Sequence, residues 1–179
     1  MSQRIGQYLA LFIGAGLLAL VQFSLVSSLP WPWNNLDLPI IAVIFSFLFF
    51  SRDQTWLLAA ASGWFLDVLG FHPFGLALLS LLFSAIIIYL VLENILTNRS
   101  LYSFLLLTFI GLVAEAFLYH IFLAIFDWSG ASQAFFLVNG AFWEALAWKL
   151  VLSLLIVGLF FNLIALASRR LQPFFLKER

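Results

Sequence analysis

Residues 101–126 read LYSFLLLTFIGLVAEAFLYHIFLAIF, and this stretch decides the fold of the chain. It contains one acidic residue, Glu115, and no Lys or Arg. A helix crosses the hydrocarbon core of a bilayer with about 20 residues, and backbone placed there must satisfy its own hydrogen bonds. The stretch therefore predicts a transmembrane helix, with Glu115 about half-way along it.

The whole chain, like this stretch, is rich in apolar residues and poor in charged ones. Of its 179 residues, 65% are hydrophobic and 9% are charged. An ordinary soluble domain carries about 25% charged residues. The 22 Phe and seven Trp add to the apolar surface, and aromatic rings are accommodated both by acyl chains and at the headgroup level. The composition predicts an all-α membrane protein whose solvent is lipid.

Five polar or turn-forming breaks divide the chain into about six spans. The breaks are residues 29–35, 51–54, 70–75, 93–100 and 127–133. The predicted transmembrane spans are 5–27, 36–50, 55–69, 74–92, 101–126 and 142–167, followed by a basic tail at 168–179. The second and third are short for a perpendicular crossing. With no repeat and no linker, one compact bundle over 1–179 is expected.

The basic residues predict the orientation, because Lys and Arg accumulate in short cytoplasmic loops. With the N-terminus inside, one cation falls toward the outside, Lys149. The cations on the inner side are Arg4, Arg52, Arg99, Arg169, Arg170, Lys177 and Arg179. Trp31, Trp33, Trp128 and Trp143 collect on the outer side as an interfacial belt. We expect both termini inside.

Several functional classes are disfavoured by residue content. Eight basic and eight acidic residues cancel, so no overall field attracts nucleic acid. There is no Cys, and there are two His, which leaves little for metal binding. Zinc-protease, nucleophile-elbow and phosphate-loop signatures are absent from the sequence. We expect neither enzymatic activity nor a cofactor.

Four ionisable residues fall within the predicted spans, where each costs roughly 2.5 to 3.5 kcal/mol at a helix centre. Asp67 continues a face of Ala59 and Gly63, at a spacing that lets helices approach closely. Lys149 lies at a similar outer depth, so an Asp67–Lys149 ion pair is predicted. The alternative is that Asp67 is wetted at the interface and ends its span.

The remaining two candidates, Glu115 and His120, lie on the fifth span. Glu115 follows Gly111 by one helical turn and is expected to point inward. Two roles are open for Glu115: a neutral side chain hydrogen-bonded between helices, or a part in transport. Two roles are also open for His120: a packed and hydrogen-bonded ring, or a ligand.

One turn resembles the signature of a known family. The run GWFLDVLGFHPFG, residues 63–75, looks like the Gly-x-x-x-Asp…Pro-x-Gly pattern of the rod shape-determining protein MreD family. The matching positions are Gly63, Asp67, Pro73 and Gly75. The entry to the preceding span, residues 36–39, is similar to the family as well. Beyond residues 37–75 the likeness is one of length, span count and hydrophobicity.

The resemblance implies a non-enzymatic component of the bacterial cell-elongation machinery, located in the inner (cytoplasmic) membrane. Its expected partner is an MreC-like protein, and through it MreB, RodA and a penicillin-binding protein that build peptidoglycan. In the four matching positions, Pro73 and Gly75 are expected to shape the outer turn. Gly63 permits close packing, and Asp67 anchors the turn or a partner.

The fold of the MreD family also resembles that of the substrate-binding subunits of energy-coupling-factor vitamin transporters. That likeness supplies an alternative function, because fold alone does not assign one. Two small-residue pairs of the first span, Ala10 with Gly14 and Ala15 with Ala19, are candidate docking faces for a partner helix.

Overall fold

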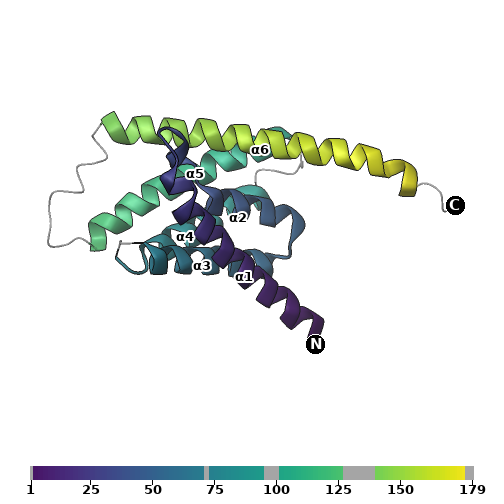
Figure 1. Ribbon diagram of the computed structural model, residues 1–179, viewed down its shortest axis with the longest axis horizontal. Helices are drawn as coiled ribbons and strands as arrows, with labels where there is room; N and C mark the ends of the chain where they lie inside the picture. Colours follow the sequence, from purple (N-terminus) through teal and green to yellow (C-terminus); the bar gives the residue numbers. More distant parts are fainter. Residues whose placement is uncertain (1, 71–72, 95–100, 127–139, 176–179) are drawn as a thin grey trace.

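Six α-helices and two short 3-10 helices make up the described part of the chain (Figure 1). The computed structural model describes residues 2–70, 73–94, 101–126 and 140–175, and the side chains of 5–47, 49–70, 73–94, 102–125 and 140–163. The elements are α1 (Ser2–Ser24), η1 (Val26–Ser28), η2 (Trp33–Asn35), α2 (Leu38–Phe49), α3 (Arg52–Leu69), α4 (Leu76–Asn94), α5 (Leu101–Phe126) and α6 (Gly140–Phe175). The prediction of an all-helical chain with six main helices is confirmed for these residues.

Local sequence explains where α2 and α3 begin. Asp37 precedes α2, and its Oδ1 accepts the Ile40 N–H at 3.3 Å. A side-chain oxygen at this position satisfies one of the free N–H groups of a first helical turn. At the start of α3, Gln54 Oε1 accepts the Ser51 N–H at 3.0 Å. The start of α3 therefore lies in the predicted break at 51–54, whereas α2 starts after Asp37, two residues inside the predicted span 36–50.

Four helices are long and apolar enough to cross a membrane, and they are compatible with a membrane protein. Their candidate spans are Ile5–Ser28, Leu76–Asn94, Tyr102–Ile125 and Gly140–Leu163. At 1.5 Å per residue, the 12 residues of α2 extend about 18 Å, against about 30 Å of hydrocarbon. The 18-residue α3 begins with Arg52 and Asp53. That α2 and α3 also cross the membrane remains a prediction.

The last helix is longer than its predicted span. With 36 residues, α6 extends about 54 Å and continues through 168–175, where the sequence predicted a basic tail. In Figure 1 its C-terminal part and the N-terminal part of α1 project from the same end of the bundle. The predicted break at 127–133 and residues 71–72 of the predicted turn lie outside the described residues.

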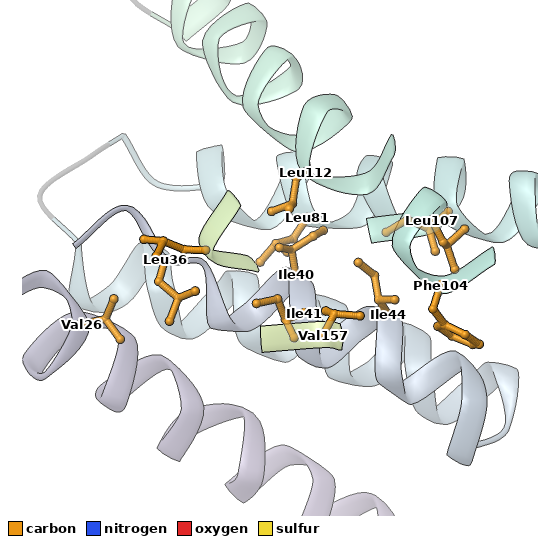
Figure 2. Packing of buried hydrophobic residues seen from close by; sticks show 12 residues of the cluster. Val26, Leu36, Ile40, Ile41, Ile44, Leu81, Phe104, Leu107, Leu112 and Val157 are labelled. Atoms are coloured by element: carbon orange, nitrogen blue, oxygen red, sulfur yellow. The ribbon is translucent and has the colours of Figure 1, made fainter. Parts of the chain in front are cut away.

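The short helix α2 supplies the centre of the hydrophobic core. Ile40, Val43 and Ile44 of this helix are fully buried. Figure 2 shows Ile40 and Ile44 beside Leu81 of α4 and the α5 side chains Leu107 and Leu112. A helix that is apolar all round lies in a protein core or in lipid, and the buried side chains of α2 pack against α4 and α5.

Large apolar side chains on the outside of the bundle are exposed, as lipid contact requires. They line α1 and α6 in particular: Ile5, Leu9, Ile13, Leu17, Val151, Leu155, Leu159 and Leu163. Rows of exposed apolar residues of this kind on a soluble protein mark an interaction surface. On a membrane helix they are the ordinary lipid-facing side.

Candidate functional site

A buried ionic cluster joins three helices at the end of the bundle that carries η1 and η2. The Nζ of Lys149, on α6, lies 2.7 Å from Oδ2 of Asp37 and 2.5 Å from Oε2 of Glu115. Asp37 stands at the start of α2, and Glu115 lies on α5. The three side chains are between 11% and 18% exposed. One ammonium thus bridges two carboxylates that are largely shielded from solvent.

Asp37 is held in place from the backbone side by Gln22. The Gln22 Nε2 donates to the Leu36 carbonyl at 2.9 Å, and its Oε1 accepts the Leu38 N–H at 3.0 Å. The single side chain therefore binds the residues on both sides of Asp37. Since Asp37 also caps α2, its carboxylate is presented to Lys149 in a fixed direction.

Asp67 binds the turn before α4, which is one of the two roles that the family resemblance implied for it. Its carboxylate accepts the backbone N–H groups of Gly75, Ala77 and Leu78 at 3.0, 2.8 and 3.0 Å. These N–H groups belong to the turn before α4 and to its first residues, where no intrahelical acceptor exists. The negative charge also lies at the positive end of the helix dipole. Asp67 therefore fixes the start of α4.

The predicted Asp67–Lys149 ion pair is wrong. Among the described side chains, Lys149 pairs with Asp37 and Glu115 instead. Asp67 is not wetted as the alternative supposed, because it is 5% exposed, although α3 does end two residues later, at Leu69. The physical reason is that three orphan N–H groups of α4 lie within reach of the carboxylate and satisfy it.

The predicted small-residue face of α3 is confirmed. Ala59, Gly63 and Asp67 are all buried on this helix. A Cβ built on Gly63 would lie 2.5 Å from the Leu78 Cα and 3.0 Å from the Ala77 carbonyl oxygen. Only a residue without a side chain permits this approach of α3 to α4.

The other two residues of the family-like pattern lie in the turn between these helices. Gly75 has φ of 97°, a conformation that glycine adopts at no steric cost. The Pro73 carbonyl accepts the Leu76 N–H at 3.3 Å. The four motif positions therefore share one structural unit, in which Asp67 binds the turn that Pro73 and Gly75 shape.

We expect replacement of Asp67 by asparagine to lower the free energy of unfolding by about 1–2 kcal/mol. The amide oxygen still accepts, but the amide nitrogen that replaces the other carboxylate oxygen cannot, so at least one of the three hydrogen bonds is lost together with the charge. Unfolding by SDS in mixed micelles, followed by tryptophan fluorescence, measures the loss. Asp53→Asn, an exposed carboxylate in the first turn of α3, is the control. Equal stability of the two variants would contradict this role of Asp67.

His120 is packed and hydrogen-bonded, as one of the two interpretations predicted. Its Nδ1 lies 2.8 Å from the Ala116 carbonyl oxygen on the preceding turn. Because a carbonyl only accepts, Nδ1 carries the hydrogen. The ring lies edge-on to Phe142 of α6, with centroids 4.7 Å apart. His120 thus contributes to the contact between α5 and α6.

Two cavities adjoin the ionic cluster, and Glu115 and Tyr119 line both. The first has a volume of about 250 Å³ and is bordered by Asn35, His120, Phe142 and Lys149 among others. The second, of about 240 Å³, is bordered by Gln22, Asp37 and Asp67 among others. Glu115 therefore stands between two spaces large enough to admit small molecules.

Asp37 and Gln22 are the site residues that sequence reasoning missed. Asp37 was taken as part of the entry to the second span, although an Asp two residues before a Pro at the start of an apolar run is a helix-capping pattern. That pattern places a second carboxylate near the depth of Lys149. For Gln22, no signal in the sequence distinguishes its side chain from other polar residues near a helix end.

Comparisons with protein-family models, curated proteins and solved structures give no match to this chain. Among the described residues, no group of three or more His, Asp or Glu is placed to hold a metal ion. The site can neutralise buried charge between helices, hold the start of α2 against α5 and α6, and present polar groups to two cavities.

Proposed function

We propose that this chain is a non-enzymatic membrane scaffold of the bacterial cell-elongation complex and binds an MreC-like partner. In this proposal all six helices lie in the cytoplasmic membrane with both termini inside. MreB, RodA and a penicillin-binding protein are reached through the partner. The resemblance at Gly63, Asp67, Pro73 and Gly75 supports the choice of family. An exposed face of small residues on α1 supports binding of a partner helix.

The two predicted small-residue faces of α1 have different environments. Ala15 and Ala19 are fully buried, and Ala15 packs against Leu58 and Ala61 of α3. Gly16 lies on the same side, against the Phe65 ring. This face of α1 is therefore covered by contacts within the bundle.

The opposite side of α1 carries Gly6, Ala10 and Gly14, one turn apart, and all three are exposed. A Cβ built on Gly6 or Gly14 meets nothing within 4 Å. Lipid tails are as apolar as leucine, so helices associate in membranes mainly where small residues let their backbones approach. An exposed stripe of this kind suits a partner's transmembrane helix, which supports a scaffold.

We expect Gly14→Leu to reduce recovery of a co-expressed MreC-like protein about tenfold, which corresponds to about 1.4 kcal/mol of binding free energy. The leucine extends into space that is open in the chain itself, so its folding is unchanged. The measurement is co-purification in detergent from cells whose chromosomal copy is deleted. Those cells should become round when only this variant is supplied.

Gly158→Leu is the matched control, because a Cβ on Gly158 of α6 also meets nothing within 4 Å. It adds the same side chain to open space beside another helix. This variant should retain the partner and the rod shape. Full retention of the partner by Gly14→Leu would contradict docking on this stripe. An unchanged chain that recovers no MreC-like protein would contradict the scaffold itself.

A further inference from the structure

We propose that the cavity between α5, α6 and η2 is a binding site for a small aromatic cation, an ammonium or amidinium attached to one ring. The cavity is the one of about 250 Å³ bordered by Asn35, Glu115, Tyr119, His120, Phe142 and Lys149, whose ammonium is paired with Glu115. This inference does not depend on the scaffold function. It rests on the charge, the free hydrogen-bonding capacity and the aromatic lining of the site.

The charge of the cluster favours a cation. Asp37 and Glu115 are two carboxylates, and the only described cation within salt-bridge distance of either is Lys149. Glu115 and Lys149 border this cavity, and Asp37 lies behind Lys149 and borders the second one. With both carboxylates ionised, the cluster has one negative charge in excess. Buried charge is costly unless it is paired, so an incoming cation completes the neutralisation. An anion would add to the imbalance.

One oxygen of Glu115 is available to a ligand. Oε2 accepts the Lys149 hydrogen bond, whereas Oε1 has no hydrogen-bond partner among the described side chains and backbone. The residue is 8% exposed, and it lines the cavity. A carboxylate accepts hydrogen bonds at both oxygens. The N–H groups of an amidinium or ammonium would supply the donor that the protein does not.

The remainder of the lining fits an aromatic ring. His120 and Phe142 stand edge to face at one wall, and Ala116, Ala145 and Leu146 give small or aliphatic surface. Aromatic faces attract cations as well as other rings. Ligand sites for drug-sized molecules measure about 300–1,000 Å³. A cavity of about 250 Å³ is suited to a one-ring compound.

Three planar probes of nearly equal shape test the proposal: benzamidinium, benzamide and benzoate. The measurement is the midpoint of thermal unfolding of the purified full chain in detergent. A ligand that binds only the folded form raises this midpoint in a saturable way. We expect benzamidinium at millimolar concentration to raise it by a few degrees, with neutral benzamide and anionic benzoate leaving it unchanged.

Two variants locate the effect. Glu115→Gln removes the charge and should abolish the benzamidinium shift, whereas Glu93→Gln, an exposed carboxylate paired with Arg52, should retain it. Ala145→Leu fills the cavity without changing any charge and should also abolish the shift. Its control is Ala147→Leu, on the exposed side of the same helix. The cavity-filling variant keeps the test decisive if Glu115→Gln does not fold.

The inference is overturned if benzamidinium gives no saturable shift. It is equally overturned if benzamide or benzoate shifts the midpoint as far, or if the shift survives Ala145→Leu. None of these results bears on recovery of the MreC-like partner, so the two proposals fail separately.

Discussion

Replacement of Lys149 by methionine should lower the free energy of unfolding by about 3–5 kcal/mol. Methionine matches the length and apolar stem of lysine but removes the only ammonium between Asp37 and Glu115. Removal of one partner from a buried ion pair leaves an uncompensated charge, which is why such changes are costly. The loss is measured by SDS unfolding in mixed micelles.

Two further variants separate charge from packing in this experiment. Arg52→Met removes a cation from an ion pair in which the side chains are 66% and 47% exposed, and it should cost less than about 1 kcal/mol. The triple variant Asp37→Asn, Glu115→Gln, Lys149→Met removes all three charges and should recover most of the stability. If Lys149→Met is no worse than Arg52→Met, the cluster does not stabilise the bundle.

The second large effect is expected from the smallest possible substitution, Gly63→Ala. The added methyl group would lie 2.5 Å from the Leu78 Cα, which is backbone and cannot rotate aside. Helices α3 and α4 must separate to relieve the contact, at a cost of about 1–3 kcal/mol. The three hydrogen bonds from Asp67 to the start of α4 stretch with them.

Gly158→Ala is the control for this prediction. The new methyl group meets nothing within 4 Å, and alanine favours a helix over glycine by up to about 1 kcal/mol. The control should therefore equal or exceed the unchanged chain in stability. If the two alanine variants unfold at the same SDS concentration, the close approach of α3 and α4 does not limit stability.

The helices could be predicted from sequence because long apolar runs admit no other structure in lipid. Residues 101–126, for example, form α5 with the predicted bounds. The C-terminal limit of α6 was not predictable in the same way. A helix leaves the membrane without a change of backbone geometry, so the basic residues after 167 marked a possible change of solvent, not the end of α6.

The partners of the polar groups were predicted less well. Sequence places Lys149 and Asp67 at similar depth, but it does not give the direction in which each helix presents them. Backbone N–H groups at the start of α4 also compete with Lys149 for the Asp67 carboxylate, and nothing in the sequence marks those groups. Gly63 was identified correctly because its spacing from Ala59 and Asp67 depends on helical periodicity alone.

The ionic cluster also has a consequence for the order in which the chain is made. Asp37 and Glu115 are synthesised first, and their cation, Lys149, comes 34 residues after Glu115 on the final helix. Until α6 docks, the carboxylates of Asp37 and Glu115 have no described counter-ion. Docking of α6 is therefore the step that supplies the cation of the cluster.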